Sequence, residues 1–246
     1  MDEALLRTEM LLGPSAMEKL SHSHVAVLGL GGVGSWCAEA LARSGVGALT
    51  LADCDQVSPS NLNRQLVATL ETLGRPKAEA MAERVSQLSP NCKVHPLVYR
   101  YTPEDRGVFF SSHYDFIVDA IDTVSCKLDL IQTALSRNIP IVSALGTGNK
   151  LDPTRFQISD ISKTQGCPLA RVIRKELRSR GVLHHRVLWS DEEPISPLDV
   201  GEAPPPGRRS IPGSVAWVPS CAGLMLAGDV ILTLTQKERE TSPKKV

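Results

Sequence analysis

The chain has 246 residues, which is enough for one large domain with a full hydrophobic core or for two small domains. Its hydrophobic fraction of 42% and charged fraction of 22% are those of an ordinary soluble globular protein. The net charge is zero, so a polyanion would have to be bound by a local basic patch. Aromatic residues make up only 4% of the chain, which argues against an aromatic stacking surface for single-stranded nucleic acid.

Cysteine spacing and apolar stretches give the expected compartment. Six cysteines are scattered without a C-x-x-C pair, which predicts reduced thiols in an intracellular protein and no structural zinc site. The charged first twelve residues do not resemble a signal peptide. The longest apolar stretch, 221–234, contains Asp229 and is too short to span a bilayer comfortably. We therefore expect a cytoplasmic protein with no membrane partner.

Short β-branched segments alternate with helical patterns over the first 145 residues. This alternation predicts an α/β fold of the Rossmann type, in which helices cover both faces of a mainly parallel sheet. The expected strands are 25–28, 49–52, 94–97, 116–119 and 141–144, and the expected helices are 34–43, 77–88 and 125–137. After Gly146 further elements extend the fold. We expect these to be strands at 156–161, 187–189 and 215–218 and helices at 169–180 and 222–234, with a Pro- and Gly-rich mobile loop at 191–213.

A glycine-rich sequence, Gly29-Leu30-Gly31-Gly32-Val33-Gly34, follows the first expected strand and begins the first expected helix. Glycines allow a tight turn, and the free N–H groups of a helix N-terminus bind phosphate. Asp53 ends the next expected strand, where a carboxylate can accept hydrogen bonds from ribose hydroxyls. These features predict a nucleotide site, but a nicotinamide-dependent dehydrogenase would have both. A Walker A loop is absent, since no Gly-Lys-Ser/Thr follows the glycines.

Polar and charged side chains that hydride transfer would not need follow Asp53. They are Asp55, Asn61, Asn63, Arg64, Gln65, Lys77, Asp119 and Asp122. Adenylation of a carboxylate does need such groups, because a triphosphate, a divalent metal ion and the attacking carboxylate must be held together. We expect Arg64 and Lys77 to neutralise developing charge on the phosphates and Asp122 to hold the metal ion.

The glycine loop, Asp-x-Asp, Asn-x-x-Arg-Gln and the Lys thirteen residues after that Arg together resemble the ubiquitin-activating (ThiF-like) superfamily. The resemblance implies that Asp53 binds ribose, that Arg64 and Lys77 bind the phosphates, and that Asp122 binds magnesium. It further implies a nucleotide site lined by the glycines together with Asp55, Asn61, Asn63 and Gln65. It also implies a homodimer in which Arg7 reaches the ATP of the partner subunit.

Within the superfamily the chain resembles the tRNA threonylcarbamoyladenosine dehydratases. The motifs that carry this resemblance are Leu11-Leu12-Gly13, Asp122-Thr123-Val124 with Lys127, Gly146-Thr147-Gly148, Pro168-Leu169-Ala170-Arg171 and Pro219-Ser220. The two C-x-x-C pairs usual in carrier-protein adenylyltransferases are missing. The implied reaction is ATP-dependent dehydration of threonylcarbamoyladenosine next to the anticodon: adenylation of the threonyl carboxylate, ring closure by the ureido nitrogen, and release of AMP.

This family resemblance extends the list of expected ligands and partners. Lys127 joins the expected nucleotide-binding residues, and the implied cofactors are ATP and Mg²⁺, with a monovalent cation, Na⁺ or K⁺, and no zinc. The implied partners are tRNA, a second copy of the chain and a sulfur-transfer protein. We interpret 1–236 as one adenylating domain, with a nucleotide-binding half at 20–146 and a substrate-binding half at 147–236, followed by a polar tail at 237–246.

Other functions are compatible with the same residues. They are adenylation of the C-terminus of a ubiquitin-like sulfur-carrier protein, a nicotinamide-dependent dehydrogenase, and a nucleotide-sensing module without catalysis. Cys167 or Cys221 could also act as a thioester nucleophile. The family pattern leads us to expect an acidic residue before Pro168. This chain departs from that pattern, because it has Gln165-Gly166-Cys167 there.

A row of basic residues lies on the helix expected at 169–180. Arg171, Arg174, Lys175 and Arg178 are spaced i, i+3, i+4 and i+7, so they share one face. The expected apolar face carries Leu169, Ile173 and Leu177. The row is either a contact surface for the tRNA backbone or a solvated helix face.

Overall fold

The structure is a computed structural model that describes residues 3–198, 201 and 212–239. Seven strands form one sheet in the order β3-β2-β1-β4-β5-β7-β6. They are β1 (His24–Leu28), β2 (Ala48–Ala52), β3 (Lys93–Leu97), β4 (Phe116–Asp119), β5 (Ile141–Ala144), β6 (Phe156–Asp160) and β7 (Arg186–Ser190). Among these strands the neighbouring pairs are parallel except β6 with β7. The predicted α/β fold with a mainly parallel sheet is confirmed.

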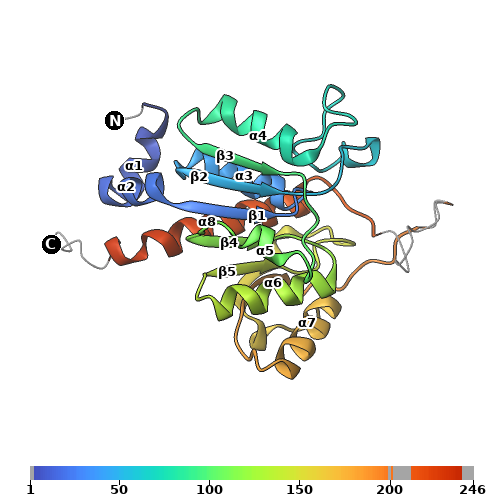
Figure 1. Cartoon of the computed structure of the whole chain (residues 1–246). Coiled ribbons are helices and arrows are strands. Elements are labelled where there is room, and N and C mark those ends of the chain that lie inside the picture. Colours follow the sequence, from blue (N-terminus) through green and yellow to red (C-terminus); the bar gives the residue numbers. More distant parts are fainter. Residues whose placement is uncertain (1–2, 199–200, 202–211, 240–246) are drawn as a thin grey trace.

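Helices cover both faces of this sheet (Figure 1). They are α1 (Leu6–Leu12), α2 (Pro14–His22), α3 (Gly34–Arg43), α4 (Lys77–Leu88), α5 (Arg106–Phe109), α6 (Val124–Ser136), α7 (Pro168–Ser179) and α8 (Trp217–Arg239). Short 3₁₀ turns lie at Glu3–Leu5, Pro59–Asn61, Pro153–Arg155 and Ile161–Lys163. One apolar core packs α2, α3, α4 and α8 against one face, and a second packs α5, α6 and α7 against the other.

The strand order places a ligand site at the middle of the sheet. β1 pairs with β2 on one side and with β4 on the other. The strands that follow β1 are therefore added first toward one edge of the sheet and then toward the other edge. In open α/β sheets, ligands bind beyond the carboxyl ends of the strands at such a reversal. β1, β2 and β4 carry four buried residues each, as expected for strands covered on both faces.

Two parts of the fold differ from the sequence prediction. The strand expected at 215–218 was wrong: residues 212–216 are irregular, and α8 begins at Trp217, five residues before the helix predicted there. Valines and a tryptophan suggested a strand, but Pro219 fits the first turn of a helix, where no intrahelical N–H bond is lost. Sequence analysis also missed α1 and α2. Most of the loop predicted at 191–213, from 199 to 211, lies outside the described residues apart from Gly201.

α8 is a long apolar helix of 23 residues. Its segment Trp217–Thr235 is long and apolar enough to cross a membrane, but most of this segment is buried in the protein, as in the core helix of a globular fold. Asp229 within this segment accepts a hydrogen bond from Arg186 Nε at 2.7 Å. Gly223 lets α8 lie against the start of α3, because a Cβ there would be 2.3 Å from the Val33 carbonyl oxygen. The helix continues to Arg239, into the segment predicted as a polar tail.

Candidate active site

A cavity of about 670 Å³ lies at the carboxyl ends of the central strands. Its volume is within the range of about 300–1,000 Å³ that is usual for small-molecule and cofactor sites. One side is formed by the glycine loop, the ends of β2 and β3 and the start of α4. The other side is formed by the turn after β4, the loop 146–148, and residues 212–214 and 219. The cavity therefore combines both halves of the sequence.

The glycine loop turns sharply between β1 and α3. Gly29 has φ +84°, and a Cβ there would lie 2.6 Å from the Ala120 carbonyl oxygen. A Cβ on Gly34 would lie 1.8 Å from the Gly29 carbonyl oxygen, so only glycine fits at either position. Gly31 and Gly32 line the cavity at the N-terminus of α3. The loop thus presents backbone rather than side chains to a ligand, as phosphate binding requires.

Asp53 is held firmly at the end of β2. Its Oδ2 accepts a hydrogen bond from the Leu30 N–H at 2.6 Å, and its Oδ1 accepts one from the Asp55 N–H at 2.8 Å. These two bonds fix the carboxylate beside the glycine loop, where it is 8% exposed and lines the cavity. Each carboxylate oxygen keeps a second lone pair, which can accept a hydrogen bond from a ribose hydroxyl.

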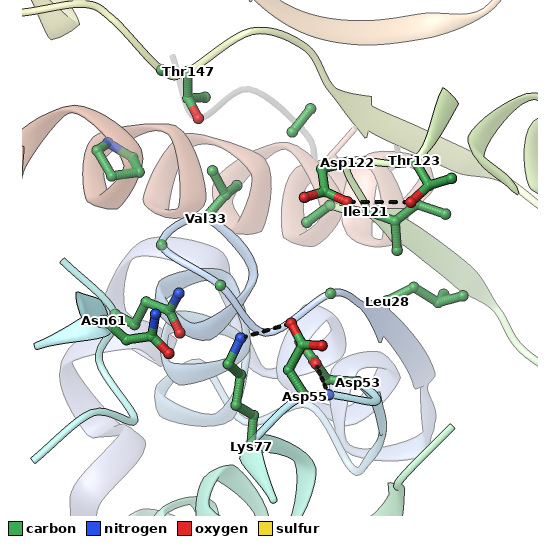
Figure 2. A pocket seen from close by; sticks show the side chains of 18 of the residues that line it. Leu28, Val33, Asp53, Asp55, Asn61, Lys77, Ile121, Asp122, Thr123 and Thr147 are labelled. Atoms are coloured by element: carbon green, nitrogen blue, oxygen red, sulfur yellow. Dashed lines mark hydrogen bonds and ion pairs between the residues drawn. The ribbon is translucent and has the colours of Figure 1, made fainter. Parts of the chain in front are cut away.

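Lys77 and Asp55 form a charge pair in the cavity wall. Lys77 begins α4 and is 5% exposed, and its Nζ lies 3.1 Å from Asp55 Oδ2 (Figure 2). Burial acts to raise the pKa of Asp55, but the adjacent Lys77 ammonium and its hydrogen bond outweigh this effect, and the pKa is lowered. Asp55 is therefore ionised at neutral pH. The pair places a buried ammonium at the cavity surface.

Arg64 is the second cation of the lining. The residue is half-buried, and burial lowers its guanidinium pKa from a very high ordinary value. Its Nη1 donates hydrogen bonds to the Ser60 carbonyl oxygen at 2.9 Å and to Asn63 Oδ1 at 2.8 Å. Asn63 Nδ2 in turn donates to the Ser214 carbonyl oxygen at 2.9 Å. The guanidinium is therefore held by neutral acceptors and keeps its charge for an anionic ligand.

Asp122 lies on the wall opposite Lys77, in the turn after β4 (Figure 2). Its Oδ1 accepts a hydrogen bond from Thr123 Oγ1 at 3.3 Å. Mg²⁺ prefers oxygen ligands and is commonly bound by one or two carboxylates together with substrate phosphates. An exposed carboxylate facing a nucleotide cavity fits this requirement. Within the described part of the chain, the three potential metal ligands that lie close together are Asp53, Cys54 and Asp55, and Asp122 is not one of them. A metal ion held by Asp122 would therefore take its other ligands from phosphate and water.

Lys127 lies behind the cavity wall and not in its lining. It is 1% exposed, and its Nζ donates to Asp119 Oδ2 at 2.7 Å and to the Ala144 carbonyl oxygen at 3.2 Å. Asp119 Oδ1 also accepts a hydrogen bond from the Ile121 N–H at 3.2 Å. This buried pair joins the turn after β4 to the end of β5. The geometry makes Lys127 a brace between two walls, in place of the expected nucleotide contact.

Comparison with known proteins identifies the family of the chain. A model described as the ThiF family matches residues 5–246. The chain belongs to this family. It is 46% identical over 236 residues to a tRNA threonylcarbamoyladenosine dehydratase of Bacillus subtilis, with 93% of each chain covered. A solved structure of the E. coli tRNA N6-threonylcarbamoyladenosine dehydratase in complex with ATP has a TM-score of 0.87 and 34% identity, covering 98% of this chain and 97% of that one.

The ThiF-family relatives also include carrier-protein enzymes. A sulfur carrier protein ThiS adenylyltransferase of Escherichia coli is 36% identical over 136 residues, 54% of each chain. The dehydratase of B. subtilis is matched over nearly its whole length and at higher identity. The resemblance predicted from the sequence, to this superfamily and to its dehydratase branch, is confirmed.

Most residues that the sequence assigned to the ThiF-like nucleotide site come together in the cavity. Its lining contains Gly29, Gly31, Gly32, Asp53, Asp55, Asn61, Arg64, Gln65, Lys77 and Asp122. Gly34 and Asn63 contact this lining from behind. Arg7 is exposed on α1, at the end of the sheet where β1 begins, whereas the cavity lies where β1 ends (Figure 1). Arg7 is therefore not among the residues that line the cavity of its own subunit.

The basic row on α7 is shorter than expected. Arg171, Lys175 and Arg178 are exposed, but Arg174 is half-buried and its Nη1 donates to the Thr164 carbonyl oxygen at 2.7 Å. Arg174 is placed inward because it lies one turn after buried Ala170, beside the apolar face. That face carries Ala170, Ile173 and Leu177, while Leu169 is half-buried and lines the cavity.

Sequence analysis missed several residues of the cavity. Tyr99 and Arg100 follow β3, Cys126 lies on α6, and Ser214 and Pro219 flank the start of α8. The available signal was topological: residues that follow a parallel strand meet the other strand ends at one edge of the sheet. By the same criterion Arg100 could have been predicted as a third cation in this part of the lining.

The two candidate nucleophilic cysteines lie outside the cavity lining. Cys167 is 4% exposed, and its Sγ accepts a hydrogen bond from the Ala170 N–H at the start of α7. Cys221 is half-buried on α8. The position of Cys167 indicates a helix cap, and neither thiol is placed to attack an adenylate formed in the cavity.

Proposed function

We propose that the chain is an ATP-dependent dehydratase that cyclises threonylcarbamoyladenosine in tRNA. The observation that carries this proposal is the composition of the cavity. One side is formed by the glycine loop, whose backbone can bind phosphate, together with Asp53, Arg64 and Lys77. The opposite wall, formed by residues 146–148 and 212–214, leaves room in the cavity for a second reactant. The match to a B. subtilis dehydratase over 93% of both chains supports this choice of reactant.

The proposed reaction needs charge stabilisation more than it needs a protein nucleophile. The threonyl carboxylate attacks the α-phosphorus of ATP, and pyrophosphate leaves. The ureido nitrogen of the same modification then attacks the activated carbonyl, loses its proton, closes a ring and expels AMP. Arg64 and Lys77 would stabilise charge on the phosphates, and Mg²⁺ held by Asp122 would neutralise phosphate oxygens. Ring closure is intramolecular and benefits from high effective molarity, which agrees with the absence of Cys167 and Cys221 from the cavity lining.

The direct test is incubation of the protein with ATP, Mg²⁺ and threonylcarbamoylated tRNA, followed by mass analysis of the nucleosides. We expect a product lighter by one water and one AMP released for each product. No product is expected with unmodified tRNA or with NAD in place of ATP. A parallel reaction with a ubiquitin-like sulfur-carrier protein tests the alternative. AMP formation with that protein and none with tRNA would reverse the proposal.

We also propose a two-fold dimer in which Arg7 serves the cavity of the partner subunit. Arg7 is exposed and absent from the lining of its own cavity, and two-fold dimers are the commonest closed assemblies. Mixing inactive Arg7→Ala protein with inactive Lys77→Ala protein should restore activity, because a mixed dimer contains one intact site. No recovery after subunit exchange, or a monomer in sedimentation analysis, would contradict the trans assignment. A cytoplasmic location, a monovalent cation and a sulfur-transfer partner stay predictions.

The exposed basic face of α7 is our proposed contact for the tRNA backbone. α7 begins at the cavity, since Leu169 in its first turn belongs to the lining. Arg171, Lys175 and Arg178 continue outward from there on the exposed side of the same helix. An adenosine in the cavity would therefore have its flanking phosphates near a row of cations. Contacts of this kind position a nucleic acid without reading its sequence.

A further inference from the structure

Asn63 connects the two sides of the cavity through a single carboxamide. Its Oδ1 accepts a hydrogen bond from Arg64 Nη1 at 2.8 Å, and its Nδ2 donates to the Ser214 carbonyl oxygen at 2.9 Å. Arg64 lies on the phosphate side of the cavity, and Ser214 lies on the other side, 151 positions after Asn63 along the chain. Asn63 itself is absent from the lining. A side chain in this position can act on a ligand only through its two neighbours.

Ser214 belongs to a segment, 212–219, that we name the strap. Pro212, Gly213, Ser214 and Pro219 of the strap line the cavity. The strap is tied to the loop after β5 by two hydrogen bonds: Gly213 N–H to Asn149 Oδ1 at 2.6 Å, and Asn149 N–H to the Gly213 carbonyl oxygen at 2.8 Å. Asn149 adopts φ +59°, a left-handed conformation that asparagine tolerates better than most residues.

The other end of the strap contacts the phosphate side directly. A Cβ on Gly32 would lie 3.0 Å from Pro219 Cβ and 3.4 Å from Arg64 Cγ, so these three residues are packed closely together. Any shift of the strap would therefore be felt at the glycine loop and at Arg64. The hydrogen bonds of Asn63 are the polar connection that accompanies this packing.

We propose that Asn63 is a positioning residue that orients the Arg64 guanidinium toward the phosphates. Through Asn63, the orientation of Arg64 depends on whether the strap is packed in the position seen in this structure. The inference rests on the proposed function in one respect, the assignment of Arg64 to the β- and γ-phosphates of ATP. The guanidinium is a donor only, and the Ser214 carbonyl is an acceptor only, so the residue between them must accept on one side and donate on the other. An asparagine does both without neutralising Arg64. Leucine has a similar shape and does neither.

The coupling has a reciprocal consequence. If the packed position of the strap orients Arg64 better and so strengthens ATP binding, then bound ATP must stabilise the packed position of the strap by the same free energy. The strap also forms the substrate-side wall of the cavity. Asn63 therefore links the binding of the triphosphate to the completion of the wall against which the second reactant is placed.

The first test compares ATP with AMP by calorimetry in the absence of tRNA. Asn63→Leu should weaken ATP binding about tenfold, as for loss of a hydrogen bond to a charged group. AMP lacks the terminal phosphates, and its affinity should change less than about twofold. Ser60→Ala is the matched control, because it keeps the Ser60 carbonyl that holds the same guanidinium nitrogen, and both affinities should be unchanged. Equal weakening of ATP and AMP would mean a merely structural role and would overturn the proposal.

Two further measurements test the route of the effect. In an Arg64→Ala background, Asn63→Leu should cause no additional loss of ATP affinity, since a residue that acts through another is not additive with it. Additive losses would contradict the proposal. Hydrogen exchange of a peptide covering the strap should be slowed by ATP in the wild type and not in Asn63→Leu, and identical ATP protection in both would exclude the coupling. Failure of wild-type protein to cyclise tRNA, with these binding results intact, would instead reject the proposed function.

Discussion

Lys77→Ala is expected to lower kcat for AMP formation by about 100-fold or more, because a buried charge that stabilises the transition state is removed. Lys77 is 5% exposed in the cavity wall and lies at the start of α4, so its position is fixed by the fold. Single-turnover formation of AMP from ATP and threonylcarbamoylated tRNA measures the effect. Lys93→Ala is the matched control: Lys93 is exposed at the opposite end of β3, and activity should stay within about twofold.

A second variant separates the action of Lys77 on ATP from its action on Asp55. Removal of Lys77 leaves Asp55 without its cation partner at 3.1 Å, and an unpaired carboxylate beside phosphates would itself repel them. Lys77→Ala/Asp55→Asn removes both charges. If Lys77 stabilises the phosphates directly, the double variant stays as inactive as the single one. Recovery of activity in the double variant would show that Lys77 serves only to neutralise Asp55.

The parts of the site that could be predicted from the sequence are those with local causes. The glycine loop makes a tight turn between a strand and a helix, and Gly29 and Gly34 are needed because a Cβ at either position would clash with the backbone. Asp53 follows the next strand, so the parallel sheet brings it to the same edge. Lys77 begins a helix whose pattern predicted its bounds correctly.

Other placements depended on contacts between distant segments. Arg174 was expected among solvated cations, but Thr164 offers its side chain two acceptors, ten positions earlier in the chain. Lys127 was expected at the nucleotide, but the buried carboxylate of Asp119 fixes it behind the wall. Val215 and its neighbours looked like a strand because apolar periodicity does not distinguish short strands from buried helix starts. For Arg174 and Lys127 a tertiary partner decided the outcome.

Arg171→Glu/Lys175→Glu/Arg178→Glu is expected to weaken tRNA binding about 100-fold at 0.1 M salt. If each cation neutralises one phosphate, the log–log dependence of affinity on salt should become shallower by about 2 to 3, since each neutralised phosphate contributes about 0.7 to 0.9. Filter binding of threonylcarbamoylated tRNA over a range of salt concentrations measures both quantities. Arg174 is left in place, because its hydrogen bonds to Thr164 hold the loop before α7.

The helix should tolerate these changes, because its packing comes from Ala170, Ile173 and Leu177, all buried on the other face. ATP affinity should be unaltered, since none of the three cations belongs to the cavity lining. Lys175→Glu and Lys93→Glu form a matched pair, the same charge reversal on α7 and at the end of β3 away from the cavity. Only Lys175→Glu should change the salt slope. Equal, small effects of the pair would mean that the α7 row is a solvated face and that tRNA is bound elsewhere.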